Sequence, residues 1–139
     1  MPVNDIKSML MRDEGLRLKP YPDSVGKMTI GYGRNLDDRG VSVAEADFML
    51  DNDITAATAD VLRTIPWSMS LDEVRRSVLV NMTVNMGVGG VLGFRRMLAA
   101  AERGDWATAA KEMLDSKWAT QVGPRAHRLA QSMETGEWR

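Results

Sequence analysis

The sequence lacks the residues on which many metal sites and covalent enzymes depend. Its 139 residues include no cysteine and one histidine, His127. The absence of cysteine excludes a disulfide scaffold, a thiol nucleophile and a cysteine-ligated metal. One histidine is too few for a histidine-rich zinc site, and it restricts a serine–histidine–aspartate triad to that residue. We therefore expect neither a metal nor another cofactor.

Long apolar runs and an excess of charge are also missing. No segment reaches the roughly 18 to 20 apolar residues that cross a bilayer. The first residues place charges among apolar positions, which is not typical of a signal peptide. The net charge of -1 argues against nucleic acid as the main partner, because binding to phosphates needs clustered lysine and arginine. We expect one compact domain over 1–139, a monomer without a membrane anchor.

The pattern of the first third predicts a helix followed by a small sheet. Apolar residues at helical spacing begin after Asn4 or Asp5 and predict a helix buried on one face. This helix should end near Glu14, because Gly15 suits the position after a helix. Between 16 and 36, glycines and prolines interrupt short apolar runs, which indicates a small antiparallel sheet. The fold class is therefore α+β, with the sheet confined to this third.

Capping motifs predict where the later helices begin. Ser42 with Glu45 forms a Ser-x-x-Glu capping box that opens a long helix, which Pro66 ends. Ser70 with Glu73 forms a second box, whose helix should stop at the following glycines. Further helices are expected over about 94–103, 105–117 and 124–134.

Glu14 and Asp23 are the acidic residues with the most informative surroundings. Glu14 ends a helix, where the dipole disfavours negative charge and so favours a protonated acid. Asp23 lies in a solvated Pro-Asp-Ser turn, which suits an ionised carboxylate. A glycosidase needs one group of each kind beside the scissile bond. Spacing alone does not distinguish this pair from two solvated surface acids.

Longer motifs connect the chain to a known family. The run Arg-Asp-Glu-Gly-Leu-Arg-Leu-Lys-Pro-Tyr-Pro-Asp at 12–23, followed by Thr-Ile-Gly-Tyr-Gly at 29–33, resembles the catalytic region of the phage-type lysozymes. These are endolysin muramidases of glycoside hydrolase family 24, which include the T-even type. The similarity continues in the family's order at 75–76, 81–82, 85–87, 93–94, 106, 116–118, 124–126 and 135–138.

The resemblance implies a two-lobed lysozyme-like fold and muramidase activity on bacterial peptidoglycan. The implied parts are a helix and sheet lobe at about 13–41, a connecting helix at about 42–65 and a helical lobe at about 67–139. The implied reaction is hydrolysis of the β-1,4 bond between N-acetylmuramic acid and N-acetylglucosamine. By position, Glu14 is implied as the general acid, Asp23 as the residue that assists the attacking water, and Thr29 as a residue that holds that water.

The resemblance also implies supporting residues. Tyr32, Asn85 and Arg125 match positions that bind substrate or support the cleft. Arg125 matches an arginine that reaches toward the catalytic Glu14, and we expect Asn85 to hydrogen bond near Trp118. We also expect most methionines and tryptophans of the helical lobe, Trp138 among them, to pack in its core.

Two features depart from the T-even pattern. Arg34 stands where many relatives have histidine, and we expect it to form a structural ion pair with Asp53 that does not titrate near neutral pH. Few residues separate Gly33 from Ser42, where the T-even type has a much longer insertion. The sheet lobe should therefore be small, and sugar contacts on that side are not implied by the resemblance.

Three functions remain open from the sequence. The first is an endolysin for host cell lysis, made in the host cytoplasm and acting on the wall in the periplasm, with release by a holin or delivery by a tail. The second is a peptidoglycan-binding or virion structural module without turnover. The third is a lytic transglycosylase, which needs an acid but no water-directing aspartate. Asp23 and Thr29 together therefore favour hydrolysis.

Overall fold

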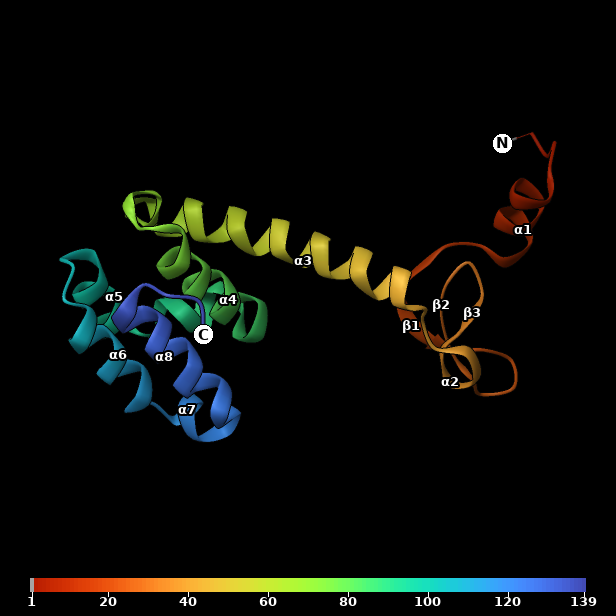
Figure 1. Ribbon diagram of the computed structural model, residues 1–139. Coiled ribbons are helices and arrows are strands. Elements are labelled where there is room, and N and C mark those ends of the chain that lie inside the picture. The colour runs from red at the N-terminus through yellow and green to blue at the C-terminus, as the bar shows by residue number, and fades with distance from the viewer. Residues whose placement is uncertain (1) are drawn as a thin grey trace. The chain divides into compact units, whose positions relative to one another are not determined.

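The computed structural model describes residues 2–139, which form two compact units with a boundary between Phe48 and Met49 (Figure 1). We call residues 2–48 the sheet unit and residues 49–139 the helical unit. The predicted α+β class is confirmed, because a small antiparallel sheet precedes a long helix and a helical region. The elements of the sheet unit are α1 (Ile6–Glu14), β1 (Arg17–Pro22), β2 (Met28–Gly31), β3 (Arg34–Asn35) and α2 (Leu36–Arg39).

Helix α1 begins and ends where the sequence predicts. The side chain of Asp5 caps it by accepting a hydrogen bond from the Ser8 backbone amide at 2.7 Å. Gly15 follows its last residue with a φ of 70°, and its amide donates to the Met11 carbonyl. None of its residues is buried within the sheet unit, and the burial of one face stays a prediction.

The sheet has three antiparallel strands in the order β1-β2-β3. Thr29 on β2 is opposite Tyr21 on β1 and Asn35 on β3. The helix α2 was not predicted. Asn35 caps it by accepting a hydrogen bond from the Asp38 amide at 2.9 Å. The sheet is therefore followed at once by a short helix rather than by an open loop.

The long helix α3 (Val43–Thr64) begins with the predicted capping box. The Glu45 amide donates to Ser42 Oγ at 3.1 Å, and the Ser42 amide donates to Glu45 Oε1 at 2.9 Å. The helix ends before Pro66, as expected. Its 22 residues give a length of about 33 Å at 1.5 Å per residue.

The helical unit contains the rest of α3 and six further elements. These are η1 (Pro66–Ser70), α4 (Glu73–Leu92), α5 (Arg95–Glu102), α6 (Trp106–Leu114), α7 (Lys117–Val122) and α8 (Pro124–Thr135). Figure 1 shows α6 beside both α5 and α8, against which it packs.

Two sequence predictions about these helices are wrong, and a third, the stop at Gly87, is confirmed in part. Asp72, rather than Ser70, caps α4 by accepting from the Arg75 amide at 3.1 Å, because Ser70 belongs to the 3-10 turn of η1. At Gly87 the helix is interrupted, as predicted, by a non-helical conformation with a φ of 79° and a ψ of 156°, and a second helical segment continues to Leu92 within α4. The single helix expected over 105–117 is divided, because Ser116 caps a new helix at α7.

The core of the helical unit is formed by apolar side chains from α3 to α8. The largest fully buried apolar residues are Val61, Leu79, Met82, Val91, Met97, Met113 and Met133. Trp118 is buried and Trp106 packs against this core at half burial. Trp138 is 63% exposed, so its predicted core position is wrong; it lies beyond the left-handed Gly136 that ends α8.

Arg75, in the first turn of α4, contacts residues of α6 and α8. Its Nε donates to the Met133 carbonyl at 2.6 Å, and Nη2 donates to the Glu134 carbonyl at 2.8 Å. The guanidinium carbon lies 4.0 Å from the centre of the Trp106 ring, and Nη1 lies 3.2 Å from Asp72. One largely buried cation therefore connects the start of α4 to the last turn of α8.

No single helix among residues 2–139 has both the length and the hydropathy needed to cross a membrane. The bent pair of α4 and α5 reaches that threshold by length and composition, with an angle of 100° between them. Residues of both helices, including Leu79 and Met97, belong to the buried core of the helical unit.

Candidate active site

Glu14 lies against the turn between β2 and β3. It is the last residue of α1 and its side chain is exposed. A Cβ on Gly33 would lie 2.5 Å from Glu14 Oε2, so a side chain there would require the Glu14 carboxyl group to move. Gly33 also has a φ of 76°, a conformation that favours glycine. The second glycine of the Gly-Tyr-Gly motif therefore makes the space that the Glu14 carboxyl group occupies.

Asp23 is fixed by the backbone of the turn between β1 and β2. Its Oδ1 accepts hydrogen bonds from the amides of Val25 at 2.9 Å and Lys27 at 2.8 Å. Its own amide donates to the Lys27 carbonyl at 2.9 Å. Within residues 2–139 these bonds occupy Oδ1 and leave Oδ2 without a donor. One carboxylate oxygen is therefore structural, and the other can accept a proton or a hydrogen bond.

Thr29 is the most enclosed of the three predicted catalytic residues. It is 3% exposed on the central strand β2, and its Oγ1 donates to the Lys27 carbonyl at 2.9 Å. Because the hydroxyl proton is used in that bond, the oxygen presents its lone pairs as acceptors. The same carbonyl accepts from the Asp23 amide, so one peptide group connects Thr29 with Asp23.

The structure brings Glu14, Asp23 and Thr29 together in the sheet unit. Asp23 lies in the turn that precedes β2, Thr29 lies on β2, and Glu14 contacts the turn that follows it. The four residues of β2 separate its ends by about 10 Å at 3.3 Å per residue. This order can place a proton donor and a proton acceptor on either side of a substrate, with a hydroxyl acceptor between them.

Tyr32 lies in the same turn as Gly33 and is 42% exposed. It lines a pocket of about 360 Å³ with side chains of α1, among them Met11, and with Leu16, which lies just before β1. This places Tyr32 beside the end of the helix that carries Glu14. Its role in substrate binding or cleft support stays a prediction.

Arg34 pairs with Glu45 and not with the predicted Asp53. Its Nη1 and Nη2 each lie 2.8 Å from a Glu45 carboxylate oxygen, and Nη1 also donates to the Gly40 carbonyl at 3.1 Å. The short connection before α3 keeps Arg34 at the first turn of that helix. Asp53 lies eight residues further along α3, about 12 Å at 1.5 Å per residue. The predicted ion pair with Asp53 is therefore corrected to one with Glu45.

The pairing changes the titration of both groups. Hydrogen bonds from Arg34, and then from Ser42, lower the pKa of Glu45 to about 2. The hydrogen bond to Glu45 raises the pKa of Arg34. The ion pair therefore keeps its charges throughout the neutral range.

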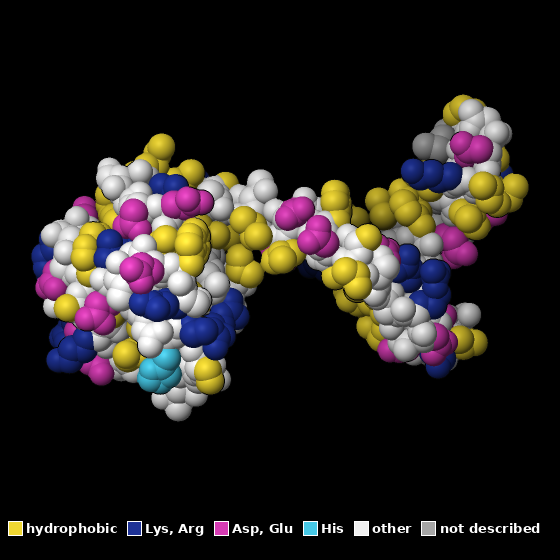
Figure 2. Space-filling view, viewed as in Figure 1, with side chains coloured by type: hydrophobic (Ala, Val, Ile, Leu, Met, Phe, Trp, Pro, Cys, Tyr) yellow, Lys and Arg dark blue, Asp and Glu magenta, His cyan; other side chains and the backbone are white. Residues whose placement is uncertain are grey.

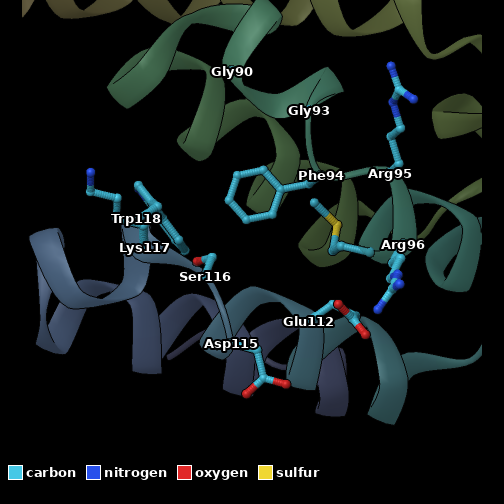
Figure 3. Close-up of a pocket in the computed structure, with 11 residues that line it drawn as sticks. Gly90, Gly93, Phe94, Arg95, Arg96, Glu112, Asp115, Ser116, Lys117 and Trp118 are labelled. Atoms are coloured by element: carbon cyan, nitrogen blue, oxygen red, sulfur yellow. The ribbon is translucent and has the colours of Figure 1, made fainter.

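Asn85 and Trp118 form the hydrogen bond that the resemblance implied, within the helical unit. Trp118 Nε1 donates to Asn85 Oδ1 at 2.8 Å. The Trp118 ring meets the Phe94 ring edge to face, with centroids 5.9 Å apart. Both rings line a pocket of about 570 Å³ whose wall also includes Ser116 and Glu112 (Figure 3). This pocket offers two aromatic faces beside charged side chains.

Arg125 lies on α8 and its side chain bonds to Asn81 on α4, within the helical unit. Its Nη2 and Nε donate to Asn81 Oδ1 at 2.7 and 3.1 Å. The predicted reach of Arg125 toward Glu14 joins residues of separate units and stays a prediction. Figure 2 shows the histidine, His127, at the surface of the helical unit, with lysine and arginine side chains on the same face.

Two residues of the sheet unit were not identified from the sequence. Lys27 supplies the peptide carbonyl that joins Asp23 to Thr29. Asp37 accepts a hydrogen bond from the neighbouring Met28 amide at 2.8 Å. The sequence signal that could have identified Asp37 is the asparagine followed by two acids at 35–38, a pattern typical of the start of a helix.

Comparison with known proteins agrees with this arrangement. A family model described as phage lysozyme matches residues 11–132. The chain is 32% identical to probable T4-type lysozyme 1 of Dictyostelium discoideum, over 96% of each chain. It is 29% identical to probable T4-type lysozyme 2 of the same organism, again over 96% of each. It is also 31% identical to the pre-baseplate central spike protein Gp5 of Enterobacteria phage T4, over 97% of this chain and 28% of that protein.

Proposed function

We propose a catalytic mechanism for this chain from the premise that it belongs to the phage lysozyme family. As a member of that family it is a lysozyme, a muramidase that hydrolyses peptidoglycan. The finer proposal concerns the bond and the residues. The bond is the β-1,4 linkage between N-acetylmuramic acid and N-acetylglucosamine, Glu14 is the general acid, and Asp23 with Thr29 directs the attacking water.

The hydrogen bonds around the Lys27 carbonyl carry this proposal. Asp23 Oδ1 and the Thr29 hydroxyl proton are already committed to the backbone, which leaves Asp23 Oδ2 and the Thr29 lone pairs as acceptors. A single water molecule has two protons to donate, and its own lone pair can then attack a carbon atom. The two acceptors thus suit a water-orienting role better than a binding role alone.

In the proposed reaction, Glu14 donates its proton to the glycosidic oxygen as the bond to the anomeric carbon breaks. The water oxygen forms the new bond to that carbon, and one of its protons passes to Asp23 Oδ2. Because water attacks the anomeric carbon directly, from the face opposite the leaving oxygen, the proposed reaction inverts that carbon, and it requires the roughly 6.5 to 9.5 Å between carboxyl groups that inverting enzymes use to admit water.

The substitution Glu14→Gln tests the general acid. We expect the rate of peptidoglycan hydrolysis to fall by about 10²- to 10⁴-fold, because glutamine has no acidic proton to give. The measurement is the loss of turbidity of permeabilised Gram-negative cells, with circular dichroism to show that the variant is folded. Asp13→Asn is the matched control, since Asp13 is the neighbouring exposed acid and pairs with Arg12. A Glu14→Gln variant as fast as the wild type would refute the assignment.

The products distinguish the other candidate functions. Hydrolysis yields a reducing sugar, and inversion yields the α anomer first, which proton NMR detects. A lytic transglycosylase would instead release a 1,6-anhydro sugar, which mass spectrometry shows to be lighter by one water molecule. A binding or structural module would retain sacculi without releasing either product.

We further propose that the chain serves host cell lysis, made in the host cytoplasm and acting in the periplasm. The substrate supports this location, because peptidoglycan lies outside the cytoplasmic membrane. Access then depends on a holin or on delivery by a tail, and similarity to a protein named as a central spike keeps the second route in view. Expression in a Gram-negative host with and without a holin tests the first route, since lysis should then require the holin.

A further inference from the structure

The short helix α2 contacts the peptide group on which the proposed water-directing residues depend. This peptide joins Lys27 to Met28, and its carbonyl accepts from the Asp23 amide and from Thr29 Oγ1, each at 2.9 Å. The amide of the same peptide, which belongs to Met28, donates to Asp37 Oδ2 at 2.8 Å. We infer that Asp37 is a positioning residue that acts on Asp23 and Thr29 through this peptide, an inference that rests on the proposed function.

The planarity of the peptide group makes this contact effective. The carbonyl and the amide of one trans peptide point in opposite directions within a common plane. A bond that fixes the Met28 amide therefore also fixes the direction of the Lys27 carbonyl. Asp37 thus orients the carbonyl that accepts hydrogen bonds from Asp23 and Thr29, although in the described residues no hydrogen bond joins Asp37 to either of them.

The need for Asp37 follows from the short third strand. Strand β3 pairs Asn35 with Thr29 and ends there, so the ladder does not continue to Met28. The Met28 amide would otherwise lack a protein acceptor on that side. The Asp37 carboxylate takes the place that a backbone carbonyl of a longer strand would occupy, and it does so from the first turn of α2.

The neighbouring acid makes a weaker contact with the same segment. Asp38 Oδ1 lies 3.2 Å from Lys27 Nζ, and both side chains are about half exposed. Exposed ion pairs of this kind contribute little, because solvent screens them and two flexible side chains must be ordered. Asp37 differs because it bonds to the backbone itself, and so we assign the positioning role to it.

The first test compares two substitutions of Asp37. Asp37→Ala removes the acceptor, and we expect kcat on peptidoglycan to fall by about 10- to 100-fold with little change in KM, since a shift of about 1 Å in a catalytic group can cost that much. Asp37→Asn keeps an oxygen that can accept from the Met28 amide, so it should restore kcat to near the wild-type value. Asp47→Ala is the matched control, because Asp47 is an exposed acid at the start of α3.

A second measurement reads the hydrogen bond directly. Amide hydrogen exchange at Met28, followed by NMR on the full chain, should be slow in the wild type and in Asp37→Asn and fast in Asp37→Ala. Thermal unfolding confirms that each variant is folded at the assay temperature. Fast exchange at Met28 in the wild type would overturn the inference without any variant.

Kinetic outcomes separate this inference from the proposed function. A wild-type kcat in Asp37→Ala would overturn the positioning role while leaving the mechanism intact, provided that Glu14→Gln is inactive. A loss in Asp37→Asn equal to that in Asp37→Ala would also overturn it, since the acceptor would then not be the cause. An active Glu14→Gln would instead refute the proposed function, and the Met28 exchange rates would still test the geometry.

Discussion

In the helical unit, large side chains from five helices are completely buried, whereas in residues 2–48 of the sheet unit Thr29 is the one buried residue. The helical unit is thus stabilised mainly by removal of apolar surface from water. The sheet unit depends on aspartate side chains that bond to backbone amides, at Asp5, Asp23 and Asp37. Two different kinds of interaction stabilise the two units.

The two units differ in whether their residues are expected to affect catalysis or stability. The residues proposed to move protons lie in the unit with the polar network, where backbone amides already fix the Asp23 carboxylate. The buried methionines, leucine and valines lie in the other unit, where packing tolerates no large change. Substitutions in the two units should therefore affect different measurements.

The largest effect on stability is expected from Leu79→Ala in the helical core. Leu79 is fully buried, and loss of its side chain should lower the free energy of unfolding by about 2–5 kcal/mol. Leu18→Ala, the same substitution at an 80% exposed position of the sheet unit, should change it by no more than about 0.5 kcal/mol. Urea denaturation measures both. Equal losses would contradict the difference between the units.

A smaller effect, on activity, is expected from Gly33→Ala. The new methyl group would enter the space of Glu14 Oε2 and displace the proposed acid, so activity should fall by about tenfold or more. Gly26→Ala is the matched control, because Gly26 also has a positive φ, 86°, but nothing lies within 4 Å of its Cβ position. Both variants should lose similar stability, about 1 kcal/mol, from backbone strain. Equal activity in the two variants would show that Glu14 does not depend on Gly33.

The smallest effect is expected from Glu45→Gln, and it depends on pH. The pKa of Glu45 is lowered to about 2 by Arg34 and Ser42, below its value of about 4.3 in an unfolded chain. Its contribution to stability is therefore present above about pH 4.3 and is lost as the pH falls toward about 2. The substitution should flatten the dependence of Tm on pH in that interval. Asp47→Asn, at an exposed position of the same helix, should leave the profile unchanged.

Local signals in the sequence were sufficient where the structure depends on neighbouring residues. The capping box of Ser42 and Glu45 is present as predicted, since both partners lie within one helical turn. The similar box at Ser70 is absent because η1 includes that serine and Asp72 is nearer to the true start of α4. A Ser-x-x-Glu motif therefore does not form a capping box when another capping residue lies two positions closer to the start of the helix.

Contacts between distant segments were not predictable in the same way. Glu45 was identified as a cap, but its second role as the partner of Arg34 depends on the path of the chain from Gly33 to Ser42. The resemblance supplied Glu14, Asp23 and Thr29 as candidates. It did not identify the Lys27 carbonyl or Asp37. A backbone carbonyl is not specified by residue type, and Asp37 lies in the short segment between Gly33 and Ser42, where this chain departs from the T-even pattern.

The contacts of Arg75 have a consequence for how the chain is synthesised. The carbonyl groups that this arginine binds belong to residues 58 and 59 positions later. During translation its guanidinium therefore remains without these acceptors until Met133 and Glu134 have left the ribosome. The helical unit can close only after α8 has emerged, whereas the hydrogen bonds around Asp23 can form while most of the chain is still to be made.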